Sequence, residues 1–473
     1  MARALVTVDA EKASKQDLEL LKKLVMEFKD ELDALGVKVD SLDKRVAVLE
    51  ENLGGWKLGG QFWFDANFAG GDQANSNYTE GANDNSFQKT RFRLTLQKQI
   101  SETTSFYAQF RAGSESAGTG TSGLGDISQI NVREIYVDTL LPWDINFRVG
   151  RFFVDFEADH GLYVDNDAIF GDYRVDGFQL SKTWSSFSAK AVIARNVGNE
   201  WNSASVLNAM GGEYYGPKYG ANEDQAFSVN SGYMNYALDL TWQPTANFFL
   251  GVNGNWFIED SNNNDPEIID MAARDFGGDF STYGVYASYN FTPAVKLQGT
   301  YYFQDIDEGY LIAGMASMNP LGDATEDNPQ AWRATLDLGQ DLLKFTGLRF
   351  EYQEQDNTFV GVRNPYTFDK DTGNAASVSD NMPWNDGTTK FFFVYAPQKW
   401  NDKWSSYLRY THADFDSNGL DDADSYGIGI TYQYTPAIAF RLAYDYTDYG
   451  DNNPTGFYSG DDHVIQFRTA INF

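Results

Sequence analysis

The chain has 473 residues, no cysteine and a formal net charge of −31. These values exclude disulfides and thiolate metal sites, and they make binding to nucleic-acid phosphates unfavourable. Its three histidines are far apart, so neither a histidine-rich metal site nor a serine–histidine hydrolase is indicated. No stretch approaches the roughly 18 apolar residues of a membrane helix. The first residues lack the apolar core of a signal peptide, so the chain is either cytosolic or a mature or truncated product.

A heptad pattern between residues 18 and 53 predicts a long helix near the start of the chain. Apolar residues keep a strict 3,4 spacing for more than four heptads, which is typical of a coiled coil. Opposite charges at the flanking positions, Lys38 with Asp43 and Arg45 with Glu50, favour a parallel homo-oligomer. A helix packed on its own domain is the alternative. The predicted oligomerisation residues are Leu18, Leu21, Val25, Phe28, Leu32, Leu35, Val39, Leu42, Val46, Leu49 and Leu53.

After Gly54 and Gly55 the hydrophobic pattern changes to a period of two, which predicts β-strands up to the end of the chain. Aromatic residues make up 16% of the sequence and glycines number 43, a composition typical of β-rich proteins. The predicted strands are 57–69, 88–99, 103–113, 129–141, 145–154, 174–183, 186–196, 232–244, 246–258, 282–291, 295–304, 331–340, 345–356, 388–397, 403–412, 424–435, 438–449 and 462–473.

The connections between these strands alternate between short and long. Short ones such as "LPWD", "QPTA" and "YTPA" alternate with long ones rich in Gly, Asn and Asp, such as 197–231. A water-soluble sandwich gives no reason for this alternation. A transmembrane barrel does, because it has short turns on one side of the membrane and long loops on the other.

The two faces of the predicted strands also favour a barrel around water. In 88–99, Phe92, Leu94 and Leu96 share one face, and basic residues share the other. Charged groups cannot line a dry core unless they are paired, but they can line a water-filled lumen. Five tryptophans beside short turns fit an aromatic girdle at one membrane interface. They are Trp143, Trp184, Trp242, Trp400 and Trp404.

The predicted fold class is therefore an all-β transmembrane antiparallel β-barrel preceded by an N-terminal α-helical coiled-coil stalk. Eighteen strands are counted and 16 is the alternative; either number leaves an aqueous channel. The predicted domains are 1–17, a linker or the end of a preceding domain; 18–53, the parallel stalk; and 56–473, the barrel.

A family resemblance rests on "LLKKLVMEFKDELDALGVKVDSLDKRVAVLEENL" followed by "GGWKLGGQFWFDANF". This stretch resembles the peptidoglycan-tethered outer-membrane porins that carry an S-layer-homology (SLH) domain, the OmpM type. The resemblance implies an SLH domain that binds cell-wall polymer, a coiled coil across the periplasm and a trimeric porin in the bacterial outer membrane. The SLH domain is missing here, and "MARA" resembles the tail of its last helix, so we expect the chain to begin inside a longer protein. The terminal Phe473 resembles the C-terminal signature of outer-membrane barrels.

The candidate pore constriction combines a loop and a wall. In general porins, which this barrel resembles, the third loop folds inward, and here that loop is 155–173. It would supply carboxylates opposite a basic wall, and such rows of opposite charge orient dipolar solutes and set ion preference. The simpler interpretation is a set of solvated lumen residues. The predicted carboxylates are Asp155, Glu157, Asp159, Asp165 and Asp167, and the predicted basic wall is Lys89, Arg91, Arg93, Arg111, Arg148 and Arg151.

The stretch "DFDSNGLDDAD" resembles the start of a calcium loop of the EF-hand type. Asp414, Asp416 and Asn418 precede Gly419, and Asp421 is a further candidate ligand. Serine stands where such a loop has its final glutamate, so we favour an acidic, exposed hairpin loop over a Ca²⁺ site. No other cofactor is expected.

The sequence favours a diffusion porin that passes ions and small hydrophilic solutes. Its expected partners are further copies in a homotrimer, outer-membrane lipid and lipopolysaccharide, and peptidoglycan through the missing SLH domain. The alternative is a structural tether with a plugged barrel. An enzymatic barrel is not indicated, since no nucleophile accompanies the histidines near the loops, His160 and His412. Trimeric autotransporters also join a coiled coil to a barrel, but each of their chains supplies only a few strands.

Overall fold

The computed structural model describes residues 23, 54–72, 85–112, 130–154, 173–196, 233–259, 280–307, 325–359, 378–383, 385–417, 419–454 and 457–473. The chain divides into two compact units, Met1–Lys57 and Leu58–Phe473. Of the predicted stalk, only Lys23 is among the described residues, and it is helical; the heptad positions lie outside them. Within the described part of the chain, none of the helices is both long and apolar enough to span a membrane.

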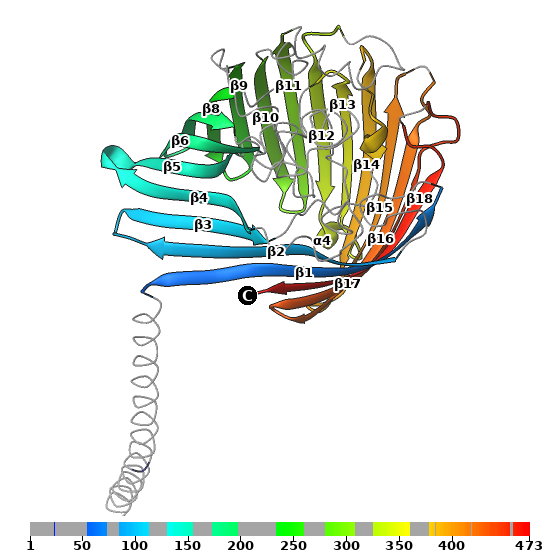
Figure 1. The fold of residues 1–473 in the computed structure, drawn as a ribbon, viewed down its shortest axis with the longest axis horizontal. Helices are drawn as coiled ribbons and strands as arrows, with labels where there is room; N and C mark the ends of the chain where they lie inside the picture. Colours follow the sequence, from blue (N-terminus) through cyan, green and yellow to red (C-terminus); the bar gives the residue numbers. More distant parts are fainter. Residues whose placement is uncertain are drawn as a thin grey trace, which may run out of the picture. The chain divides into compact units, whose positions relative to one another are not determined.

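Leu58–Phe473 forms a closed barrel of 18 antiparallel strands (Figure 1). Each strand pairs with the next along the chain, and β1 pairs with both β2 and β18, which closes the sheet. The count of 18 is thereby confirmed. The strands are β1 (Trp56–Gly71), β2 (Asn85–Gln99), β3 (Thr104–Ala112), β4 (Ile130–Leu141), β5 (Ile145–Val154), β6 (Tyr173–Trp184), β7 (Phe187–Asn196), β8 (Tyr233–Thr245), β9 (Phe248–Glu259), β10 (Phe280–Thr292), β11 (Val295–Ile306), β12 (Gln330–Leu338), β13 (Leu348–Asp356), β14 (Thr388–Lys399), β15 (Trp404–Phe415), β16 (Ala423–Thr435), β17 (Ile438–Asp448) and β18 (Asp461–Asn472).

The predicted alternation of connection length is confirmed. Only two residues separate β8 from β9, β10 from β11 and β16 from β17. Two other short connections contain small helices, η1 (Pro142–Asp144) after β4 and α4 (Gln340–Leu343) after β12. The next connection along the chain is long in each case, and the one between β13 and β14 contains η4 (Val378–Asn381). The short turns therefore all lie at one end of the barrel and the long loops at the other.

The barrel is apolar outside and polar inside, the reverse of a water-soluble domain. In β16, for example, the outward-facing Ile428 is 51% exposed, whereas the inward-facing Ser425 is fully buried. In β13, Glu351, Gln353 and Gln355 point inward and are buried by neighbouring polar side chains. The alternating pleat of the strands produces this division, because successive side chains point to opposite faces.

Aromatic side chains surround the barrel at its short-turn end. Trp143 is 81% exposed, and Trp184, Trp400 and Trp404 are also exposed at short turns. Trp242 lies beside them on the outer surface and stacks on Phe187, with 5.8 Å between ring centroids. Exposed Phe187, Phe291, Phe345, Tyr434 and Phe473 extend this ring of aromatic residues. The arrangement is typical of the girdle where a barrel passes from hydrocarbon to headgroups.

Candidate functional site: the barrel lumen

Polar and charged side chains cover the inner wall of the barrel, and most form contacts between neighbouring strands. On β3–β5, Arg148 donates two hydrogen bonds to Asp138, from Nε at 2.8 Å and from Nη2 at 2.9 Å. Its guanidinium lies 4.0 Å from the ring centroid of Tyr136, which stacks on Tyr107. The pleat of β5 places Arg148 on the same face as the buried Phe152 and Val154, and its charge is paired with a carboxylate on the adjacent strand. Its role in a pore constriction stays a prediction.

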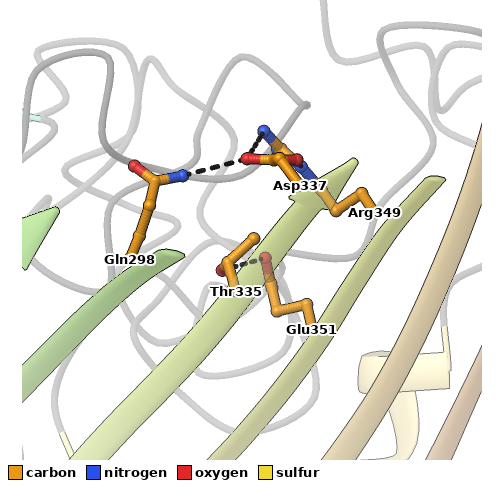
Figure 2. Close-up of polar contacts among 5 residues, drawn as sticks. All are labelled: Gln298, Thr335, Asp337, Arg349 and Glu351. Carbon is orange, nitrogen blue, oxygen red and sulfur yellow. Dashed lines mark hydrogen bonds and ion pairs between the residues drawn. The ribbon is translucent and has the colours of Figure 1, made fainter. Parts of the chain in front are cut away.

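A second cluster spans β11, β12 and β13 (Figure 2). Asp337 accepts hydrogen bonds from Arg349 Nε at 2.5 Å and Nη2 at 3.1 Å, and from Gln298 Nε2 at 3.4 Å. One step along the same strands, the Thr335 hydroxyl donates to Glu351 Oε2 at 3.0 Å. Figure 2 shows these five side chains on the same side of the sheet. Because they hold one another, the wall presents fixed dipoles and paired charges to the lumen.

The seam between the first and last strands is joined by a buried ion pair. Asp65 of β1 lies directly opposite Arg468 of β18, and both oxygens of its carboxylate accept hydrogen bonds at 2.8 Å from Arg468 Nε and Nη2. The Asp65 and Arg468 side chains are 0% and 2% exposed. The guanidinium also lies 4.4 Å from the ring centroid of Trp63. Next to this pair, Gln466 donates to Asn67 at 3.0 Å.

On β15–β17 an ion pair crosses over an intervening strand. Arg409 of β15 binds Asp445 of β17, although Gly427 of β16 lies between them in the register. A Cβ atom at position 427 would lie 2.4 Å from Asp445 Oδ1 and 2.6 Å from Arg409 Nη2. A side chain at position 427 would therefore displace the ends of the Arg409 and Asp445 side chains.

Part of the long connection between β13 and β14 lies against the inner wall. Val378 and Met382 are fully buried in a hydrophobic cluster with inward-facing Phe391, Phe393 and Phe415. This segment also exchanges two hydrogen bonds with the backbone of Tyr458, from Asn381 Nδ2 at 2.8 Å and to Asn381 Oδ1 at 2.7 Å. The described segment thus fills one side of the barrel at the long-loop end.

Asp386 joins the same connection to the one that precedes β12. Its carboxylate accepts hydrogen bonds from the Thr325 hydroxyl at 2.6 Å and from the amides of Thr325 at 2.5 Å and Glu326 at 2.8 Å. Partial burial raises the pKa of Asp386, but the three hydrogen bonds outweigh it and hold the pKa below its ordinary value. The ionised carboxylate therefore stabilises the contact between the two loops.

The predicted constriction is only partly within the described residues. The loop carboxylates Asp155, Glu157, Asp159, Asp165 and Asp167 lie outside them, and Lys89, Arg91 and Arg111 are described only as backbone. Arg93 lies opposite Arg111 in the register of β2 and β3, as expected for two residues on one face. The strand pairing also places Arg441 opposite Arg468 on the inner wall. Arg441 and Arg468 were not among the predicted wall residues, although counting alternate residues along β17 and β18 places both on the inner face. The inward segment around Val378 has only a weak signal in the sequence, a valine and a methionine in a polar loop.

The structure corrects the assignment of Arg151 to the pore wall. Arg148 and Arg151 are three positions apart in β5, and the regular pleat places them on opposite faces. Arg151 lies opposite Ile135 of β4 and Asp176 of β6 and shares the outer face with exposed Phe178. It therefore does not line the lumen.

The predicted calcium ligands have other contacts. Asp414 Oδ2 lies 3.6 Å from Lys390 Nζ on the outer face, and Asp421 accepts a hydrogen bond from the Asn452 amide at 3.2 Å. Asn418 lies outside the described residues. Among the residues that the structure does describe, no group of three or more acidic or histidine side chains could hold a metal. Calcium binding by Asp414, Asp416, Asn418 and Asp421 stays a prediction.

No known family model matches the sequence, and no curated protein matches it. Solved structures match the fold. The chain is similar to Pseudomonas aeruginosa OccK8 (OprE), with a TM-score of 0.51 and 10% identity over 88% of this chain and 98% of that one. Pseudomonas aeruginosa OccD3 (OpdP) gives 0.46 and 13% over 88% and 91%, and the outer membrane channel DcaP of Acinetobacter baumannii gives 0.42 and 11% over 88% and 97%. At 10% identity the likeness to OccK8 concerns the fold alone.

Proposed function

We propose that the chain is a diffusion porin of the bacterial outer membrane that passes ions and small hydrophilic solutes. The observation that supports this function is the inverted barrel, in which 18 strands enclose a polar, charged inner wall beneath an apolar outer wall. Barrels of this strand number leave room for an aqueous channel.

The heptad pattern and the family resemblance support a larger assembly. We propose that the chain forms a homotrimer held by the coiled coil of residues 18–53. In the longer protein that the resemblance implies, an SLH domain would bind peptidoglycan and the stalk would connect it to the membrane. The stalk is tested by comparing the oligomeric state of the full chain with that of a variant in which Leu32, Leu35 and Val39 are replaced by Asp. Charges at these core positions should abolish the coiled coil.

The decisive experiment is the conductance of the purified protein in a planar bilayer with a salt gradient. Discrete steps establish open channels, and steps in groups of three indicate a trimer of open pores. The reversal potential reports whether the loop carboxylates or the arginines of the inner wall dominate ion selection. A correctly folded sample without conductance would refute the porin function.

A structural tether with a plugged barrel is the second candidate. It is favoured by one observation, the segment around Val378 and Met382 that packs inside the long-loop end of the barrel. Removal of residues 360–386 distinguishes the two. A porin conducts before and after the deletion, with larger steps after it, whereas a plugged tether conducts only after the deletion.

A further inference from the structure

Three charged residues form a row on the outer face of the barrel, across β5, β6 and β7. Arg151 lies directly opposite Asp176, and Asp176 lies directly opposite Arg195. The Nε and Nη2 atoms of Arg151 donate to the two carboxylate oxygens of Asp176, both at 2.9 Å. Arg151 Nη1 also reaches the backbone carbonyl of Val132 at 3.4 Å. We call this set the outer charge row.

The outer charge row faces away from the lumen. Its members alternate with inward residues, since the neighbouring Val175 and Ala194 are 0% and 3% exposed. The next outward positions along the same strands are Phe178 and Ile193, which are 52% and 53% exposed. The side chain of Asp176 is itself 50% exposed in the isolated chain.

The row also lies within the height of the apolar band. Arg151 is six residues from Ile145, the first residue of β5 after the aromatic end of the barrel. At about 3.3 Å per residue and a tilt of about 40°, it lies roughly 15 Å above that end, inside an apolar band about 25 Å tall. A second outward row of charges, Glu354, Lys390 and Asp414, crosses β13, β14 and β15, whereas Leu408, Ile428 and Phe467 on the far wall are outward-facing and apolar.

Lipid is a poor neighbour for this row. Charged side chains on the lipid face destabilise a barrel most strongly near the middle of the bilayer. A neighbouring protein could also fill a groove of about 640 Å³ that lies beside the ion pair. The groove is lined by Ile135, Val149, Phe178 and the backbone of Gly177. Small residues and exposed backbone in such a groove allow close approach by another chain.

We propose that the outer charge row and its groove form the surface on which a second copy of this chain packs in the membrane. The choice of occupant rests on the proposed function, in which the parallel heptads hold identical chains together. In a cyclic trimer each contact joins two different patches, so the row would meet another part of the neighbouring barrel. The neighbour would cover the half-exposed Asp176 and exclude lipid from the groove.

Site-directed spin labelling tests this directly, because the chain has no cysteine and each label goes to one position. The Phe178→Cys variant places the label beside the row, and Ile428→Cys is the matched control on the far wall, where the native residue has nearly the same exposed fraction, 51% against 52%. In the full-length oligomer in bilayers, we expect oxygen accessibility to be several-fold lower at position 178 than at 428. Ile193→Cys provides a second position beside the row if Phe178→Cys does not fold.

A charge substitution gives an independent result. Asp176→Lys turns the row into three adjacent cations, so the temperature at which the oligomer separates in seminative gels should fall by more than the temperature at which the barrel unfolds. Ile428→Lys, the control, should affect barrel unfolding without changing oligomer separation.

Equal, high oxygen accessibility at both positions would overturn the inference. The inference would also be overturned if phosphorylated lipid covered the row. In that case the label at position 178 would be accessible to oxygen, and the stability of the oligomer would depend on added lipopolysaccharide but not on Asp176. A monomeric chain that still conducts would overturn the interface and leave the porin function intact. Loss of conductance in a trimer in which position 178 is protected would refute the porin function and leave the proposed interface intact.

Discussion

Replacing Asp65 with alanine is expected to destabilise the barrel by about 3–5 kcal/mol, because it leaves the buried Arg468 guanidinium without its carboxylate. In the intact protein both oxygens of Asp65 accept hydrogen bonds at 2.8 Å, and water reaches almost none of either side chain. A loss of about 4 kcal/mol lowers the folding equilibrium constant roughly a thousandfold. The pair joins the first strand to the last, so its loss acts on barrel closure.

Two further variants determine how much of this loss belongs to the pair. Arg468→Lys keeps the charge but loses the bidentate geometry and the contact with Trp63, and we expect a loss of about 1–2 kcal/mol. In the double variant Asp65→Ala with Arg468→Ala, the loss should be smaller than the sum of the single losses by about 1–3 kcal/mol.

The assay is urea unfolding of the barrel in phospholipid vesicles, followed by tryptophan fluorescence and by the shift of the folded band in gels. Asp138→Ala is the control, since its partner Arg148 is 22% exposed and water can solvate it. There we expect a loss of only about 1 kcal/mol. An Asp65→Ala loss no greater than that of Asp138→Ala would refute the reasoning, because burial would then not determine the cost.

The other predictions concern a glycine, a loop contact and the third loop. Gly427→Ala should destabilise the barrel by about 1–3 kcal/mol in the same assay, because the added methyl group displaces the ion pair beside it. The control, Gly299→Ala, should not destabilise the barrel, since the nearest atom to a Cβ at position 299 is 3.8 Å away. Similar losses in the two variants would contradict the steric argument. Because hydrogen bonds hold the pKa of Asp386 below its ordinary 3.8, its ionised form stabilises the fold above that pH, and the advantage of the native chain over Asp386→Asn should disappear as the pH falls through the lowered pKa. A constant difference between the two unfolding free energies across that range would show that the carboxylate charge is not involved. Replacing Asp155, Glu157, Asp159, Asp165 and Asp167 of the third loop by their amides should shift the reversal potential toward anion preference, and an unchanged potential would place the selectivity elsewhere.

Period-two counting from the sequence was accurate for elements and mostly accurate for faces. The 18 strands and the short turns at one end agree with the structure. Arg151, expected at the base of the third loop, lies on the outer face instead, because it is an odd number of residues from Arg148 in β5. In β4 the pleat itself is interrupted, since a register shift opposite Gln109 and Phe110 leaves Arg133 as an extra residue. Bulges of this kind are not visible in a local pattern.

The sequence by itself determined the barrel, since strand alternation, turn chemistry and the positions of aromatic residues are properties of a few consecutive residues. Only the tertiary structure decided which charges meet. Asp65 and Arg468 are 403 positions apart, and Arg409 reaches Asp445 only because a glycine on the strand between them leaves space. The inward packing of Val378 and Met382 likewise depends on a wall built from three other strands. Such contacts follow from the register and closure of the whole sheet, which no local stretch of sequence specifies.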